Sequence, residues 1–226
     1  MKLYAIVGAG GFGREVMPLA EVMLNTQLRE GKDKLVFVVE NKNNESFVNQ
    51  YPVLSVEEFF SYSASEHYFN IAIAQHAIRK RISEKMLSLG AKPFRINAGN
   101  FIELHGNVIQ EGAIFCPFTM VTSNATIGKY FHANIYSYVA HDCVIGDYVT
   151  FAPHVQCNGN VIIEDEVYVG TGVIIREGTA ARPMIIGRGS VLGMGAVITK
   201  SVPPFVTVVG NPAKILQPVT PQATSV

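Results

Sequence analysis

The chain has 226 residues, of which 48% are hydrophobic, and its 18 basic side chains balance its 18 acidic ones. This length fits one medium domain or two small ones, and the even charge gives no sign of a nucleic-acid partner. The first residues run directly into a glycine turn, with neither a signal-peptide pattern nor an apolar run of transmembrane length. We therefore expect no membrane insertion and a cytoplasmic location.

The N-terminal part opens with a strand, a glycine turn and a helix. Residues 3–7 form a short apolar run, and residues 14–28 are amphipathic. The G-x-G-x-x-G pattern between them lets the backbone approach a phosphate, while the helix N-terminus supplies free N–H donors. A tight turn that needs glycines and binds nothing is the alternative. The candidate nucleotide-binding residues are Gly8, Gly10, Gly11, Phe12, Gly13 and, at the end of the strand predicted over 35–39, Glu40.

The remaining α/β elements leave room for only half of a dinucleotide-binding domain. A strand is expected over 69–74, a helix over 77–89 and a short strand over 93–96. One βαβαβ unit disfavours a nicotinamide dehydrogenase and favours a mononucleotide or nucleotide-sugar site. Arg79, Lys80 and Arg81 could reach a phosphate, or could simply form a solvated helix face.

The second half of the chain repeats every six residues. Each repeat begins with an apolar residue, and the fourth residue after it is small or β-branched, with Phe131 as the bulky exception. Such a repeat is typical of a parallel β-helix, in which each short strand is stabilised by stacking on its neighbours. The apolar positions are Ile109, Phe115, Val121, Ile127, Ala133, Val139, Ile145, Phe151, Cys157, Ile163, Val169 and Ile175.

The repeat is interrupted once and then resumes. Residues 176–184 break the phase, which predicts an inserted loop, and the hexads return at Ile186, Leu192 and Ile198. We expect an α/β domain over 1–97, a β-helix over 98–216 and a flexible tail over 217–226. Cys143 and Cys157 fall on inward positions and Cys116 beside one, so packing is favoured over disulfide or metal chemistry.

The hexad resembles the [LIV]-G-x-x-[STAV]-x repeat of the left-handed β-helix acyltransferases. Together with the glycine-rich N-terminal part, the H-D-C-V-I-G-D stretch at 141–147 and the V-G-N-P-A-K ending, it is similar to the bacterial sugar-nucleotide N-acetyltransferases and the sialic-acid-type sugar O-acetyltransferases. This resemblance implies a homotrimer that uses acetyl-coenzyme A, with no metal. It also implies a nucleotide sugar bound by the N-terminal domain and a thioester groove between adjacent β-helices.

The resemblance places the catalytic pair at His141 and Asp142, and the donor for the thioester oxygen at the backbone N–H of Gly159. Acyl transfer needs a base for the nucleophile's proton and a donor for the oxygen that becomes negative, and imidazoles ordinarily titrate near neutral pH. If three hexads make one coil, Gly159 stacks about 4.8 Å above His141 on the same face. An exposed corner histidine without catalytic function is the alternative.

Other polar residues are weaker candidates. His132 and His154 do not share a face with His141, although a neighbouring subunit could bring either close. Asn134 is a candidate for contact with the nucleotide sugar, and Asn124 should stack beneath Asp142, although asparagine is also common at left-handed corners. The candidate acetyl-coenzyme A residues, besides Gly159, are Gly172, Lys200 and Lys214.

The function expected from this pattern is acetyl transfer to the amino group of a nucleotide-linked 4-amino-4,6-dideoxy sugar, for polysaccharide or glycan assembly. Sugar O-acetylation is the nearest alternative, and a nucleotide-binding scaffold without catalysis is a further one. Zinc hydration chemistry on such a fold would need an H-x4-H pair of histidines, which the sequence lacks. The sequence leaves open the nucleotide base, the sugar and the acyl chain.

Overall fold

The computed structural model of the chain describes residues 1–42 and 46–218. Contacts divide it into two compact units. The first consists of Met1–Gly99 with Glu111–Ile114, and the second of Asn100–Gln110 with the described residues from Phe115 onward.

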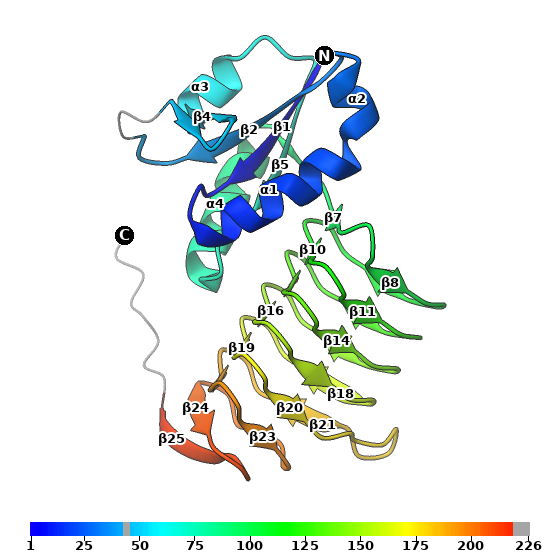
Figure 1. The fold of residues 1–226 in the computed structure, drawn as a ribbon. Helices are drawn as coiled ribbons and strands as arrows, with labels where there is room; N and C mark the ends of the chain where they lie inside the picture. Colours follow the sequence, from blue (N-terminus) through cyan, green and yellow to red (C-terminus); the bar gives the residue numbers. More distant parts are fainter. Residues whose placement is uncertain (43–45, 219–226) are drawn as a thin grey trace. The chain divides into compact units, whose positions relative to one another are not determined.

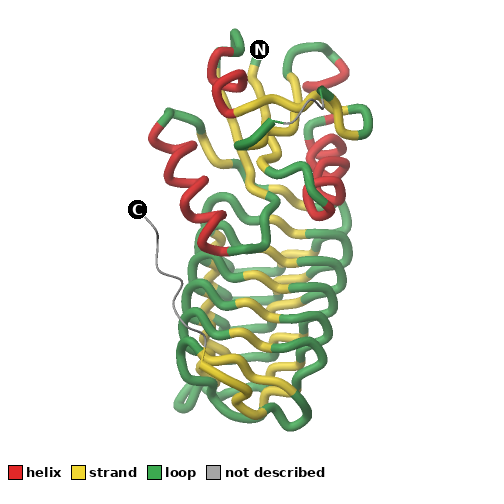
Figure 2. The backbone as a smooth tube through the Cα atoms, turned by 90° about the vertical axis from the view of Figure 1, so that its left-hand side faces the viewer, coloured by secondary structure: helices red, strands yellow, loops and turns green. Residues whose placement is uncertain are grey.

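The first unit is built on one six-stranded sheet with the order β3-β4-β2-β1-β5-β6. All neighbouring strands are parallel except β3 and β4, which form an antiparallel hairpin. Helices lie on both faces of this sheet (Figure 2). The strands are β1 (Lys2–Val7), β2 (Lys34–Val39), β3 (Phe47–Val48), β4 (Tyr51–Ser55), β5 (Glu66–Ile71) and β6 (Lys92–Pro93), and β7 (Ile96–Asn97) follows them.

The helices of this unit are α1 (Gly11–Met23), α2 (Asn25–Arg29), α3 (Val56–Ser61) and α4 (His76–Ser88). The predicted helix over 14–28 is therefore two helices, and it begins earlier, inside the glycine turn. The predicted third strand begins and ends three residues earlier, as β5. The β3–β4 hairpin and α3 were not predicted from the sequence. A capping box between Ser55 and Glu58 fixes the first turn of α3.

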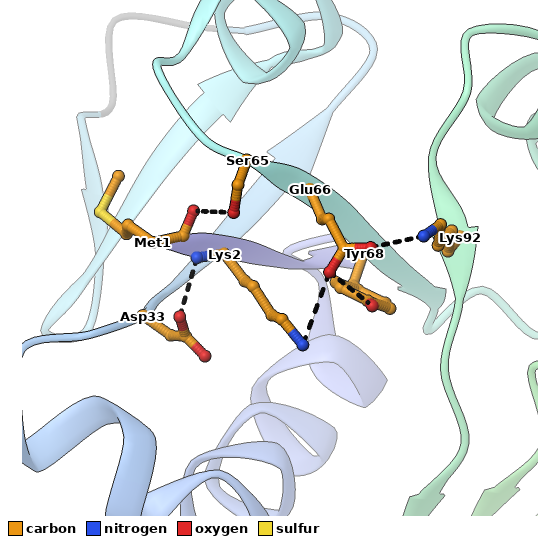
Figure 3. A network of polar contacts seen from close by, with 7 residues as sticks. All are labelled: Met1, Lys2, Asp33, Ser65, Glu66, Tyr68 and Lys92. Carbon is orange, nitrogen blue, oxygen red and sulfur yellow. Dashed lines mark hydrogen bonds and ion pairs between the residues drawn. The ribbon is translucent and has the colours of Figure 1, made fainter.

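Polar contacts hold the amino ends of β1, β2 and β5 together (Figure 3). The backbone N–H of Lys2 donates to Asp33 Oδ1 at 2.8 Å, and Ser65 Oγ donates to the Met1 carbonyl at 2.9 Å. Glu66 accepts from Tyr68 and Lys92 and forms an ion pair with Lys2. The polar groups at the amino edge of the sheet thus bond to one another. In open α/β sheets ligands bind at the carboxyl ends of the strands, so a ligand site is expected at that edge.

The second unit is a left-handed parallel β-helix of three sheets (Figure 1). One sheet contains β8 (Ile102–Glu103), β11 (Met120–Val121), β14 (Tyr138–Val139), β17 (Gln156–Cys157), β20 (Ile174–Ile175) and β23 (Val197–Ile198). The second contains β9 (Val108–Ile109), β12 (Thr126–Ile127), β15 (Val144–Ile145), β18 (Val161–Ile163) and β21 (Met184–Ile186). The third contains β10 (Ile114–Phe115), β13 (His132–Ala133), β16 (Thr150–Phe151), β19 (Tyr168–Val169), β22 (Val191–Leu192), β24 (Val206–Val209) and β25 (Lys214–Pro218).

The core of the β-helix follows the predicted hexads. Of the twelve apolar positions only Ile109 is not fully buried, and the small position is buried in every coil, Phe131 included. The three cysteines are buried free thiols, as packing predicts. Non-glycine residues with positive φ recur every six residues from Phe118 to Glu166, which marks the corners between strands.

The inserted loop lies where the phase break predicts it. Ile145 pairs with Ile163, which is 18 residues later, whereas Ile163 pairs with Ile186, which is 23 residues later. The difference is five residues, and a β-bridge between Thr179 and Arg182 closes the loop that contains them. At the other end of the unit, β25 pairs antiparallel with β24 as far as Pro218. The rest of the predicted tail, 219–226, lies outside the described residues.

Candidate functional site

The glycine turn follows β1 at the carboxyl edge of the sheet. The Gly8 N–H donates to the Val38 carbonyl at 2.9 Å, so the turn begins between β1 and β2. Gly10 occupies the N-cap position of α1 without a side chain to cap the helix. The first turn of this 13-residue helix therefore has no capping side chain, and helix N-termini bind phosphate in other proteins.

Packing requires glycine at some positions of the motif and not at others. A Cβ at Gly13 would overlap the Gly8 carbonyl, and one at Gly8, where φ is +104°, would meet Ile73 Cγ1 at 2.9 Å. These two are required by packing, as the tight-turn interpretation holds. A Cβ at Gly10 or Gly11 would meet nothing within 4 Å, and both residues are exposed. Packing therefore does not require glycine at these two positions.

Glu40 directly follows β2 on the same edge. Both of its carboxylate oxygens accept from Arg81 on α4, at 2.7 and 2.6 Å. The hydrogen bonds from Arg81 lower the pKa of Glu40 below its ordinary value, so the carboxylate is charged at neutral pH. The sequence placed Glu40 beside a ribose, and the structure adds the Arg81 contact that fixes its direction.

Arg79 differs from both of its predicted roles. Its side chain is completely buried, and Nη1 donates to the carbonyls of Ile73 and Ala74 at 2.9 and 3.1 Å. Arg79 thus holds the loop between β5 and α4, the same loop that Gly8 packs against. It is neither a phosphate ligand nor part of a solvated face.

In the second unit, His141 and Asp142 lie at a corner of the β-helix between β14 and β15. Asp142 has φ +57°, and this left-handed backbone lets its Oδ2 reach His141 Nδ1 at 2.8 Å. Both side chains are about half exposed, at 59% and 49%. A carboxylate on Nδ1 selects the tautomer whose Nε2 carries a lone pair, which is the state that a general base requires.

Gly159 stacks on His141 as the coil spacing predicts. A Cβ at Gly159 would lie 2.5 Å from His141 Cε1 and 2.6 Å from Nε2, so only glycine leaves the imidazole its position. The Gly159 N–H makes no hydrogen bond within 1–42 and 46–218. An imidazole and an unused backbone donor therefore lie side by side on consecutive coils, and acyl transfer needs a base and a donor of these kinds.

The other candidates lie elsewhere on the unit. Asn134 Oδ1 accepts from the N–H of Ile135 at 2.7 Å, so its carbonyl oxygen stabilises its own corner. His132 is buried in β13, and His154 stacks on Tyr136 with ring centroids 4.8 Å apart. Within one chain neither joins His141.

The remaining candidates for acetyl-coenzyme A are exposed or open. Gly172, with φ +70°, follows His154 one coil later, and a Cβ there would meet nothing within 4 Å. Lys200 and Lys214 are exposed near the C-terminal coils. Among the described residues, no cluster of three His, Cys, Asp or Glu side chains is arranged to hold a metal ion. No described helix has the length and apolar character needed to cross a membrane.

Comparisons with known proteins identify the family of this chain. Residues 4–86 match the model of the PglD N-terminal domain. The chain is 48% identical to GDP-perosamine N-acetyltransferase from Escherichia coli O157:H7, over 95% of this chain and 96% of that protein. The chain belongs to the bacterial sugar N-acetyltransferases with hexapeptide repeats.

Solved structures extend the match to the fold. The structure of WeeI from Acinetobacter baumannii AYE is 49% identical, with a TM-score of 0.91, and the match covers 96% of this chain and all of that one. The acetyltransferase domain of PglB from Neisseria gonorrhoeae FA1090, in complex with acetyl coenzyme A, is 28% identical with a TM-score of 0.82 over 95% of this chain and 98% of that one. The chain is therefore an acyltransferase, and the scaffold without catalysis is excluded.

Proposed function

We propose that this acetyltransferase moves the acetyl group of acetyl-coenzyme A to the amine of a nucleotide-linked 4-amino-4,6-dideoxy sugar, with GDP-perosamine as the first acceptor to test. The observation that carries the proposal is the stacking of His141 on Gly159. The 48% identity to a GDP-perosamine N-acetyltransferase supports the choice of acceptor.

The chemistry follows from the positions of three groups. His141 Nε2 takes a proton from the acceptor amine as its nitrogen attacks the thioester carbon. The oxygen that becomes negative accepts from the Gly159 N–H, and collapse of the intermediate expels the coenzyme A thiolate. Asp142 holds Nδ1 at 2.8 Å and stabilises the imidazolium that forms.

The glycine turn supplies the second part of the proposal. The helix N-terminus at Gly10 and Gly11, which has open space around it and no capping side chain, suits the diphosphate of a nucleotide sugar, and Glu40 suits a hydroxyl or N–H of the nucleoside. Binding energy from the nucleotide, which does not react, then positions the amine for attack. A free sugar would leave this turn without use.

Two further features belong to the proposal. We expect a homotrimer, because the thioester groove expected for this family needs two β-helices, and a cytoplasmic location, where nucleotide sugars and acetyl-coenzyme A are available. Gly172, Lys200 and Lys214 are proposed to contact the coenzyme, and Asn134 the acceptor.

The test is thiol release by the purified chain with acetyl-coenzyme A and a panel of acceptors. The panel contains GDP-, dTDP- and UDP-linked 4-amino sugars, the unlinked amino sugars, and free sialic acid. Fastest release with a nucleotide-linked amino sugar supports the proposal. Faster release with sialic acid or with an unlinked sugar would contradict it.

A further inference from the structure

The peptide that joins Asn158 to Gly159 is anchored from the core side. The Asn158 carbonyl lies 3.1 Å from the Sγ of Cys143, a side chain that is completely buried one coil earlier. The carbonyl therefore points into the β-helix. In a trans peptide the C=O and N–H bonds point in opposite directions, so the Gly159 N–H points outward, to the side on which the imidazole of His141 lies.

The side chain of Asn158 anchors the same peptide to two other coils. Its Oδ1 accepts from the Tyr138 hydroxyl at 2.7 Å, in the coil before it. Its Nδ2 donates to the Ile175 carbonyl at 2.9 Å, in the coil after it. Burial raises the pKa of Tyr138 above its ordinary value, so the phenol keeps its proton at neutral pH and remains a donor.

We propose that Tyr138 and Asn158 are positioning residues that hold the Gly159 N–H in the direction required by the developing oxyanion. This inference rests on the proposed function and concerns residues to which neither the repeat pattern nor the family resemblance assigns a role. A donor acts in the transition state only if it is already aimed, since reorienting a peptide during the reaction would cost part of the stabilisation. Asn158, braced by Tyr138, prevents that rotation.

The test compares Tyr138→Phe, Asn158→Ala and the double variant with wild type. Tyr168→Phe is the matched control. Tyr168 is an exposed residue of β19, in another sheet, and its hydroxyl makes no hydrogen bond within the described chain. Losing a complete oxyanion donor costs roughly 10²–10³ in kcat, so a misdirected one should cost about tenfold. We expect that loss in both single variants, with the KM for acetyl-coenzyme A and the Tm near wild type.

The double variant gives the sharper result. Because both residues act on one peptide, it should lose no more kcat than Asn158→Ala alone. Losses that multiply, full turnover in Tyr138→Phe, or a fall in Tm that accounts for the lost activity would each overturn the inference. If the wild type turns over and Tyr138→Phe matches it, only this inference fails. A wild type without turnover on any acceptor would overturn the proposed function as well.

Discussion

His141 has the two properties that a general base needs at an open site, namely an accessible Nε2 and a fixed tautomer. His141→Ala should lower kcat by roughly 10²–10⁴, because general-base catalysis contributes about that much. Nucleotide affinity should stay near wild type, since the glycine turn belongs to the other unit. Steady-state kinetics and nucleotide titration measure both quantities.

The matched control is His105→Ala. His105 is an exposed histidine two coils before His141 at the same corner, and it should be replaceable without loss. If His141→Ala keeps wild-type turnover, the base lies elsewhere, for example at His132 or His154 supplied by a neighbouring subunit.

Gly159 tests the same site from its other side. Gly159→Ala places a methyl group 2.5 Å from the imidazole, which must swing away while the buried core of the coil stays intact. A misplacement of about 1 Å can cost roughly 10² in rate, and we expect at least that loss of kcat with an unchanged circular dichroism spectrum. Gly99→Ala, where the methyl group meets nothing within 4 Å, is the control. Equal turnover in the two variants would disprove the close packing of base and donor.

For single residues, the sequence predicted positions better than side-chain contacts. The spacing of 18 residues was enough to place Gly159 above His141. It could not predict that Tyr138 reaches Asn158, because that bond depends on how far a side chain extends between coils. The burial of Arg79 could not be predicted from the sequence either. An arginine that donates to carbonyls inside the fold looks the same in the sequence as one that points into solvent.

Among the elements, the glycine turn separates structural from functional residues. Gly13→Ala forces a methyl group onto the Gly8 carbonyl and should lower the Tm of the chain by several degrees, because backbone must shift. Gly10→Ala meets no neighbour, so it should leave the Tm near wild type but weaken nucleotide binding. Calorimetry on both variants, with and without nucleotide, distinguishes the effects. If Gly10→Ala lowers the Tm and leaves nucleotide binding unchanged, the motif is a tight turn that binds no ligand.

The ion pair between Glu40, which follows β2, and Arg81 on α4 should make the stability of the chain depend on pH. Arg81 lowers the folded-state pKa of Glu40 below the ordinary value of 4.5, so the pair adds stability above that value. The contribution disappears as the pH falls through the folded-state pKa. Glu40→Gln should therefore unfold at lower urea than wild type at neutral pH, and the two midpoints should converge in acid.

Glu84→Gln is the control for this comparison, because Glu84 lies exposed on the same helix without an ion pair to any described residue. Its midpoint should follow that of wild type at every pH. A difference between Glu40→Gln and wild type that persists unchanged into acid would show that the carboxylate charge is not its cause.

The elements were predictable in proportion to the strength of their pattern. The β-helix strands followed from a repeat in which every coil supports the next. The hairpin of β3 and β4 was missed because β3 has only two residues and β4 carries Pro52, a residue that argues against an ordinary strand. The predicted helix over 14–28 is divided at Leu24, which no glycine or proline marks.

For the whole molecule, the exposed corner side chains suggest contact with other copies. Phe118, Tyr136 and Met194 are exposed by 56%, 48% and 80%, and the first two stack on each other with centroids 4.9 Å apart. We predict a trimer at working concentration, checked by multi-angle light scattering. A monomer mass would contradict the trimer and would leave the thioester groove incomplete. Replacing Tyr136 by Ser should weaken assembly if this corner is part of the interface.

Analysis of the product formed from GDP-perosamine and acetyl-coenzyme A shows whether this chain acetylates the amine of a nucleotide-linked sugar. We expect one acetyl group per sugar, attached to the amino nitrogen as an amide that survives mild alkali, with none formed by His141→Ala on the same time scale. An acetyl group released by alkali as an ester, or an unmodified sugar beside hydrolysed acetyl-coenzyme A, would show that N-acetyl transfer is not the reaction.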